Sequence, residues 1–219
     1  PNKMAQATAD AVEERELTKE NKGRLNKYRT QCRTEGMPNG LERVRQAAQR
    51  SRNEKFSALF HHIAIELLKE SFFKIKKDAT PGVDKVTWEQ YAGNLDENVE
   101  DLHARLHRGA YRAKPSRRTY IPKQDGRQRP LGVAALEDKI VQRATAEVLN
   151  AIYEEDFLGF SYGFRPERQQ HQALDALAVG IRTKKINWIL DADVRDYFGS
   201  IDHNWMIKLM EHRIADKRM

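Results

Sequence analysis

Apolar residues recur at intervals of three and four through much of this chain, a spacing that places them on one face of a helix. In the first such stretch they are Phe56, Leu59, Phe60, Ile63, Leu67 and Leu68. Amphipathic helices are expected over residues 53–77, 87–106, 136–153, 169–184 and from Asp202 onward. The chain is therefore predicted to be helix-rich.

Short local signals mark where these helices begin and end. The segment T-W-E-Q at 87–90 has the pattern of a capping box, with Thr87 as N-cap and Gln90 reaching back to it. Gly109 can end the helix that follows. In D-A-T-P-G-V-D, residues 78–84, the pair Pro81-Gly82 suits the centre of a type II turn.

Two stretches favour strands. In R-R-T-Y-I-P-K-Q-D-G-R-Q-R-P-L-G-V, residues 117–133, Asp125-Gly126 predicts a two-residue hairpin turn between extended arms. A further strand is expected at 186–194. The predicted fold class is therefore α/β of the α+β type.

The positive charge of the chain is concentrated in one segment. The net charge is +7 over 219 residues, whereas the 25 residues from Arg105 to Arg129 carry nine Lys or Arg and one acid. A charge run is often only a solvated surface, but Tyr111, Tyr120 and two prolines are interleaved here. This pattern favours contact with phosphates and indicates a nucleic acid as partner.

Several classes of protein are excluded or disfavoured by composition. The single cysteine, Cys32, cannot form an internal disulfide and fits a reducing compartment. No apolar run approaches the roughly 18 residues that a membrane span needs. A cytoplasmic protein with no membrane partner is expected.

Carboxylates lie inside the predicted strand at 186–194. Side chains alternate along a strand, so Asp191 and Asp193 share a face with Ile189. A carboxylate beside a core strand is costly unless it is solvated, paired or bound to a metal. Phosphoryl-transfer enzymes use such an aspartate to hold Mg²⁺, although many α/β proteins end a strand in Asp for turn or capping reasons. Spacing alone leaves both interpretations open.

Five motifs follow one another in an order typical of a known family. They are T-P-G-V-D at 80–84, Y-R-x-x-P-x-R-R-x-Y-I-P-K at 111–123 followed by G-R-Q-R-P-L-G-V, L-E-D-K-I-V-Q at 136–142, F-S-Y-G-F-R-P at 160–166, and W-I-L-D-A-D-V-R-D-Y-F-G-S-I-D-H at 188–203. With them, the chain resembles the N-terminal part of a bacterial group II intron-encoded protein, a reverse transcriptase that also serves as a maturase.

The resemblance implies a right-hand polymerase fold with four successive parts. A flexible basic leader (1–40) and a helical N-terminal extension (41–78) would precede the fingers (79–185), and the start of the palm (186–219) would follow.

The resemblance also assigns roles to residues of the presumed polymerase site. Asp193 matches the first catalytic metal aspartate, and the backbone carbonyl of Val194 would also face a Mg²⁺ ion. Phe198 matches the aromatic residue that excludes a ribose 2′-hydroxyl. Lys123 and Arg129 match fingers residues that grip the incoming triphosphate.

Other charged residues are expected to bind RNA or to have structural roles. The expected RNA-binding residues are Arg112, Lys114, Arg117, Arg118, Arg127 and Arg165. For Arg165 the alternative is a packed aromatic loop at 160–168. Asp191 is expected to tune or support the site, Asp196 to face solvent, and Asp202 to cap a helix.

The expected function is that of an RNA-directed DNA polymerase that binds intron RNA and aids splicing and mobility. Its partners would be group II intron RNA, an RNA template with a DNA primer, and dNTPs, and a homodimer is an option. The 219 residues contain no Asp-Asp dipeptide, the second palm motif of this family, so the chain alone is expected to be inactive. The alternatives are a non-catalytic RNA-binding maturase module and a reverse transcriptase of another lineage, such as a retron, a diversity-generating element or a CRISPR-linked enzyme.

Overall fold

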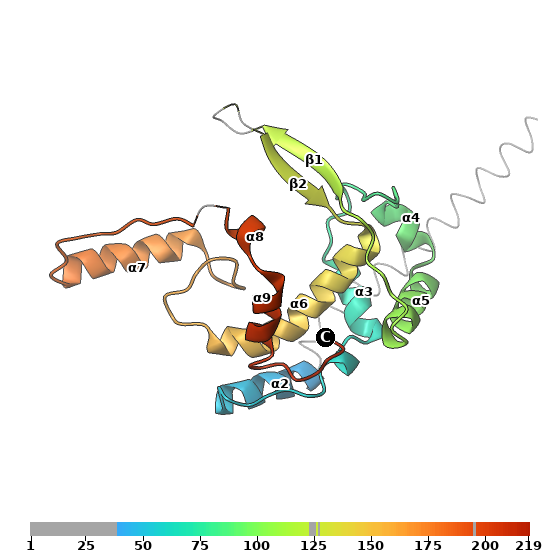
Figure 1. Cartoon of the computed structure of the whole chain (residues 1–219), viewed down its shortest axis with the longest axis horizontal. Helices are drawn as coiled ribbons and strands as arrows, with labels where there is room; N and C mark the ends of the chain where they lie inside the picture. Colours follow the sequence, from blue (N-terminus) through green and yellow to red (C-terminus); the bar gives the residue numbers. More distant parts are fainter. Residues whose placement is uncertain (1–38, 123–125, 127, 195) are drawn as a thin grey trace, which may run out of the picture. The chain divides into compact units, whose positions relative to one another are not determined.

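The computed structural model describes residues 39–122, 126, 128–194 and 196–219 (Figure 1). Its helical elements are α2 (Asn39–Arg50), the 3₁₀ helix η1 (Phe60–His62), α3 (Ile65–Phe73), α4 (Trp88–Gly93), α5 (Leu95–His107), α6 (Leu136–Asp156), α7 (Gln170–Thr183), α8 (Tyr197–Ser200) and α9 (His203–Met210). The strands β1 (Arg117–Pro122) and β2 (Gln128–Val133) pair antiparallel. The predicted helix-rich α+β class is confirmed. Except for Asn39 and Gly40 in α2, the expected leader lies outside the described residues.

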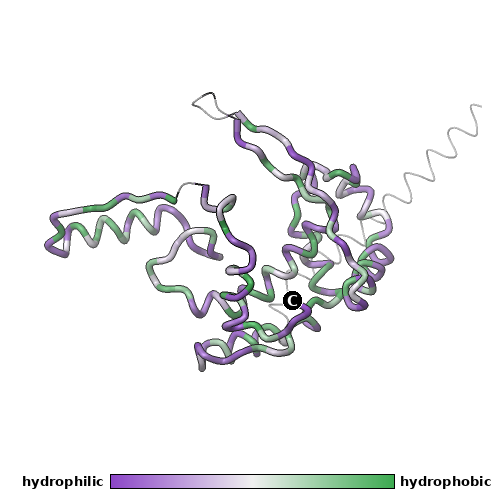
Figure 2. The backbone as a smooth tube through the Cα atoms, in the orientation of Figure 1, coloured by the Kyte–Doolittle hydropathy of each residue, from purple (hydrophilic) through white to green (hydrophobic). Residues whose placement is uncertain are grey.

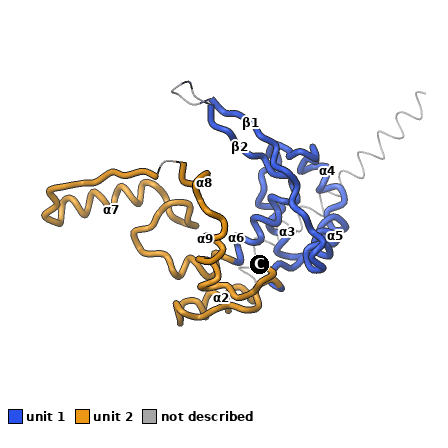
Figure 3. The backbone as a smooth tube through the Cα atoms, in the orientation of Figure 1, with its two compact units in different colours: residues 1–39, 61–148 blue, residues 40–60, 149–219 orange. Residues whose placement is uncertain are grey.

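The described residues form two compact units (Figure 3). Unit 1 comprises Asn39 and the described part of 61–148, and unit 2 comprises 40–60 and the described part of 149–219. The helix α6 is continuous and contributes residues to both. The predicted four-part division of the chain stays a prediction.

Helices α3, α5 and α6 supply the core of unit 1. Phe72, Leu68, Val99, Leu102, Ile140 and Val148 are fully buried. The Trp88 ring stacks on Phe72 with 4.6 Å between the ring centroids. These apolar positions are the ones that the helical periodicity of the sequence placed on the inner face.

The predicted capping box is confirmed, although the helix after it is interrupted. Thr87 Oγ1 accepts from the backbone N–H of Gln90, and Gln90 Oε1 accepts from the backbone N–H of Thr87. The helix expected over 87–106 is divided into α4 and α5 at Asn94, whose backbone is not helical (φ −126°, ψ 48°). Gly109 follows α5 with φ +72°, a left-handed conformation suited to glycine.

The type II turn predicted at Pro81-Gly82 is wrong. Such a turn needs a positive φ at Gly82, and among the described glycines a positive φ occurs at Gly109 and Gly126. The turn lies further on, where the Lys85 N–H donates to the Gly82 carbonyl (3.3 Å). Gly82 is needed for space instead, because a Cβ there would lie 2.5 Å from Ala135 Cα.

Gly82→Ala is therefore expected to destabilise the protein by about 1–3 kcal/mol, since the added methyl group meets backbone that cannot rotate away. Urea unfolding followed by circular dichroism measures this change. Gly93→Ala is the matched control, because a Cβ at Gly93 meets nothing within 4 Å. Equal unfolding midpoints for the two variants would contradict the steric argument.

The long helix expected from Asn53 begins only at Ile65, and that prediction is wrong for the first half of the segment. The Phe56 N–H donates to the Arg213 carbonyl (2.8 Å), and the Phe56 carbonyl accepts from the Ala215 N–H (2.8 Å). The Asp216 carboxylate accepts from the N–H groups of Leu59 (2.8 Å) and Phe60 (2.9 Å). These bonds use the backbone groups that a helix would need for itself.

Asp216 is held as a buried carboxylate, with 7% of its surface exposed. Burial by itself raises the pKa of this carboxyl group. The N–H groups of Phe60, Leu59 and Arg218, together with the Arg218 charge, outweigh burial and lower the pKa to about 2. Asp216 therefore stays ionised and caps η1 at neutral pH.

The helices after residue 169 form as predicted, but the strand between them does not. Asp202 caps α9 by accepting from the N–H groups of Asn204 (2.8 Å) and Trp205 (3.2 Å). The residues 186–194 are extended without strand pairing, and Trp188 is 92% exposed. Figure 2 shows hydrophobic positions along this solvent-exposed segment. A strand exists only through hydrogen bonds to a partner, and the described chain offers none here, so the prediction is wrong for this structure.

Candidate nucleic-acid and nucleotide site

The β1–β2 hairpin of unit 1 carries the basic segment. Pairing begins at Arg117↔Val133 and ends at Pro122↔Gln128. The hairpin is therefore confirmed, whereas Lys123, Asp125 and Arg127 in the connection lie outside the described residues. Gly126 in that connection has φ +78°, a conformation that glycine adopts without strain.

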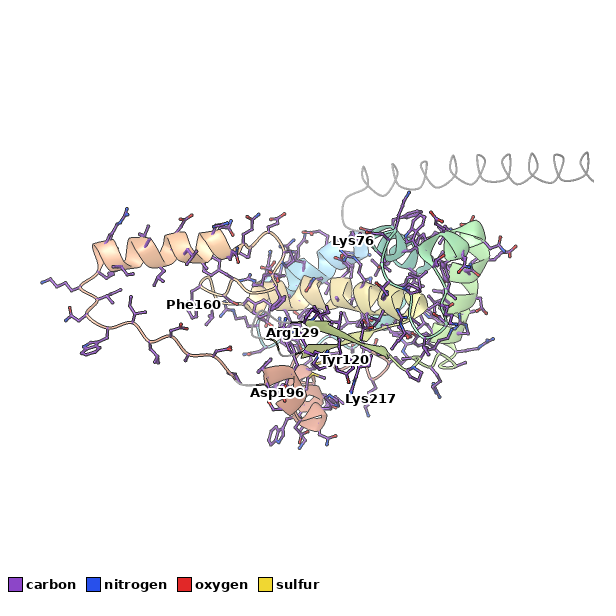
Figure 4. All side chains as sticks on the ribbon, turned by 90° about the horizontal axis from the view of Figure 1, so that it is seen from above. Lys76, Tyr120, Arg129, Phe160, Asp196 and Lys217 are labelled. Carbon is purple, nitrogen blue, oxygen red and sulfur yellow. The ribbon has the colours of Figure 1, made fainter. Side chains whose placement is uncertain are left out.

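The register divides the hairpin into two faces, because cross-strand partners point the same way and neighbours in one strand point opposite ways. We define the first face as Arg117, Thr119, Ile121, Arg129, Leu131 and Val133. The second face is Arg118, Tyr120, Pro122, Gln128, Pro130 and Gly132. The nucleotide-binding candidate Arg129 and the RNA-binding candidate Arg118 thus lie on opposite faces. Figure 4 labels Arg129 and Tyr120 on the hairpin.

The base of the hairpin is tied to the T-P-G-V-D loop of the same unit. An Arg117 guanidinium nitrogen donates to the Pro81 carbonyl (3.0 Å), and Lys114 Nζ pairs with Asp84 (3.1 Å). Lys139 Nζ donates to the Thr80 carbonyl (2.6 Å). Two of the residues expected to bind RNA, Arg117 and Lys114, therefore also hold the loop in place.

Asp138 is a second anchor, and the sequence interpretation missed it. It is only 3% exposed and accepts hydrogen bonds from the Tyr111 hydroxyl and from the Lys114 N–H (3.1 Å). Burial, and then the hydrogen bond to Asp138, raise the pKa of Tyr111. Asp138 lies in the motif L-E-D-K-I-V-Q, so its position in the first turn of α6 was the available signal.

The arginines of the basic segment differ in how they are engaged. Arg112 is exposed and donates to the carbonyls of Gly109 (3.0 Å) and Tyr111 (2.8 Å). Arg118 and Arg129 are exposed on the two faces of the hairpin. Backbone carbonyls are neutral partners, so these cations keep their charge available for phosphate.

Arg165 sits in a different environment in unit 2. Its side chain is 8% exposed and donates to the Glu154 carboxylate at 3.0 Å. It also donates to the carbonyls of Leu158 (3.1 Å) and Ser161 (2.9 Å), and its guanidinium lies over the Phe157 ring. This geometry favours the packed-loop alternative for 160–168, in which Arg165 ties the loop to the end of α6.

The candidate metal residues lie in the extended segment of unit 2. Asp191, Asp193 and Val194 are exposed, and Phe198 on α8 is 78% exposed. Asp196 is exposed, as predicted. Carboxylate and carbonyl oxygens are the ligands Mg²⁺ prefers. Within the described residues, however, no three His, Cys, Asp or Glu side chains converge as a metal site would require.

Comparison with known proteins supplies the class to which this arrangement belongs. Residues 121–218 match the family described as reverse transcriptase (RNA-dependent DNA polymerase). The matched range takes in β1, β2, α6 and the segment with Asp193. The chain therefore carries reverse transcriptase sequence, and the family has a general dependence on metal ions.

Three relatives illustrate the narrower similarity. Protein YkfC of Escherichia coli is 39% identical over 142 residues, which cover 64% of this chain and 37% of the relative. The group II intron-encoded protein LtrA of Lactococcus lactis is 29% identical over 184 residues, which cover 82% of this chain and 30% of the relative. A 91 kDa protein in cob intron of Schizosaccharomyces pombe is 39% identical over 104 residues, covering 48% and 13%.

These findings confirm the resemblance found in the motifs. The chain is homologous to group II intron-encoded proteins and corresponds to an N-terminal part of their reverse transcriptase sequence. It spans about a third of the length of YkfC and LtrA. Within the described residues, none of the helices combines the length and apolarity that crossing a bilayer requires.

Proposed function

We propose that this chain provides the fingers and the first part of the palm of an RNA-directed DNA polymerase that binds group II intron RNA and aids splicing and mobility. The match of residues 121–218 to the reverse transcriptase family carries the proposal. The ordered motifs from 80 to 203 support it. The proposed partners are intron RNA, an RNA template with a DNA primer, and dNTPs, and a homodimer is compatible with them.

The proposed polymerase site joins residues of the palm and the hairpin. Asp193 and the Val194 carbonyl would hold Mg²⁺, which neutralises charge that develops on the phosphates. Lys123 and Arg129 would bind the triphosphate of the incoming dNTP as a mobile pair of cations. Phe198 would leave no room for a 2′-hydroxyl and so select deoxynucleotides.

We further propose that the 219 residues do not polymerise by themselves. A two-metal mechanism needs carboxylates from two sources, and the chain has no Asp-Asp dipeptide. The relatives YkfC and LtrA, of which the chain spans 37% and 30%, have the length to supply the second source. For the chain in isolation, RNA binding is therefore the activity we expect to measure.

RNA binding is assigned to the basic segment. Its members Arg112, Lys114, Arg117, Arg118 and Arg127 would contact phosphates, with Arg165 as a supporting residue that orders its loop. The observation in favour is the concentration of nine basic residues and one acid in 25 residues. Steering of a polyanion by such a segment depends on charge more than on shape.

The remaining proposals concern cell location and organisation. The single Cys32 fits a reducing compartment, and we propose the cytoplasm. The division into leader (1–40), N-terminal extension (41–78), fingers (79–185) and start of palm (186–219) is part of the same proposal.

Replacing Arg118 with glutamine is expected to weaken RNA binding and to lower the slope of log affinity against log salt by about 0.7–0.9, the contribution of one phosphate contact. Fluorescence anisotropy with a labelled RNA between 50 and 200 mM salt measures both values. Arg118 is preferred to Arg117 for this test, because Arg117 also holds the Pro81 carbonyl. Arg52→Gln, an exposed arginine of unit 2, is the control. An unchanged slope for Arg118→Gln would show that this arginine only faces solvent.

A further inference from the structure

The two faces of the β1–β2 hairpin differ in chemistry, and the second face has no role in the function proposed so far beyond the charge of Arg118. The first face is anchored at its base, where Arg117 binds the Pro81 carbonyl and Val133 is 9% exposed. Its exposed apolar residues are the aliphatic Ile121 and Leu131. All six residues of the second face are exposed, and Tyr120 is 54% exposed.

The second face has the composition of a stacking surface. Tyr120 is paired with Pro130, and Pro122 follows it on the same side of β1, so flat apolar rings surround the tyrosine. Arg118 is paired with Gly132, which has no side chain that would cover the guanidinium. The face contains no acid.

The spacing of these residues suits one nucleotide and its phosphate. Residues two apart on one strand lie about 6.5–7 Å apart and point the same way. Arg118 is therefore within reach of the backbone of a nucleotide whose base lies on Tyr120. Single-stranded nucleic acids are held in this manner, by aromatic side chains under the bases and cations beside the phosphates.

We propose that the second face of the hairpin is a stacking site for an unpaired base of single-stranded RNA, with Tyr120 under the base and Arg118 at its phosphate. The proposal rests on the RNA binding proposed above and adds a site that is separate from the nucleotide-binding first face. A duplex is not a ligand of this site, because its bases are stacked on one another and present no free face. The hairpin thus contacts a nucleotide on one side and an RNA strand on the other.

The experiment compares binding of a labelled 20-nucleotide single-stranded RNA, and of the same RNA in a duplex, to the 219-residue chain. Tyr120→Ala is expected to weaken single-strand binding by about 5-fold to 100-fold, the effect of losing one stacked base. The slope against salt should not change, since no phosphate contact is lost. Tyr120→Phe keeps the ring and should bind within twofold of the parent.

Ile121→Ala on the first face is the matched control, because Ile121 is 46% exposed on the same strand. It should leave single-strand affinity within twofold. Duplex affinity should be the same for all variants, and Tyr120 is exposed, so the urea unfolding midpoint should not move. This pattern would support the site.

Three outcomes would overturn it. Equal losses for Tyr120→Ala and Ile121→Ala would show that the two faces do not differ. Tight RNA binding that is unaffected by Tyr120→Ala would remove the stacking site and leave the proposed function standing. If the parent chain binds neither RNA, the proposed RNA binding of the chain is overturned together with this site.

Discussion

Asp193→Asn is expected to abolish primer extension in a version of this chain that is continued by its native downstream sequence. An amide cannot replace the carboxylate charge opposite a divalent cation, and the loss of a metal ligand should lower the rate on the order of 10³-fold or more. Primer extension on an RNA template with dNTPs and Mg²⁺ measures the effect. RNA affinity should be unchanged, because Asp193 is exposed and adds no positive charge.

The controls separate a metal ligand from an ordinary carboxylate. Asp191→Asn changes a neighbouring exposed aspartate and should retain most of the activity. The unextended 219-residue chain should make no DNA. If the extended protein is also inactive while both bind RNA tightly, the non-catalytic maturase module is the better description, and Asp193 becomes a carboxylate of the loop before α8.

The second large effect is expected at Arg213, which holds unit 2 together. Its side chain is 7% exposed and pairs with Asp156 at 2.9 Å. It also donates to the carbonyls of Ser51 (2.9 Å) and Glu54 (2.9 Å), more than 150 residues away in sequence. Arg213→Met should destabilise the protein by about 3–5 kcal/mol, because Asp156 is left without its cation and two carbonyls without their donor.

Arg218→Met is the matched control for Arg213→Met. The Arg218 side chain is 60% exposed and lies 3.5 Å from Asp216, so its loss should cost less than about 1 kcal/mol. Urea unfolding gives both values. Hydrogen exchange at the Phe56 amide, which donates to the Arg213 carbonyl, reports on unit 2 directly. A loss at Arg213 no larger than that at Arg218 would show that the buried guanidinium is dispensable.

Elements with strong local signals were predicted well. The helices α6, α7 and α9 follow from apolar periodicity, and caps such as Asp202 and Thr87 from residue type. The hairpin followed from an Asp-Gly pair between extended arms. In each case the hydrogen bonds that define the element join residues close in sequence.

Elements that depend on distant partners were not predicted. Phe56 and Leu59 fit a helical pattern, but their backbone groups bind Arg213, Ala215 and Asp216 instead. The apolar alternation around Trp188 predicted a strand, yet alternation describes only a side-chain pattern and supplies no pairing partner. Gly82 fitted a turn pattern, whereas its actual constraint is the approach of Ala135.

The candidate site shows the same division. The amino-acid sequence by itself determined the class of the protein, the concentration of positive charge and the carboxylate at Asp193, since residue types in order are enough for these. Only the tertiary structure decided that Arg118 and Arg129 lie on opposite faces, that Arg117 holds Pro81, and that Arg165 is enclosed by its loop. The physical reason is that a side chain's availability depends on register and burial, and both are set by contacts between residues far apart in the chain.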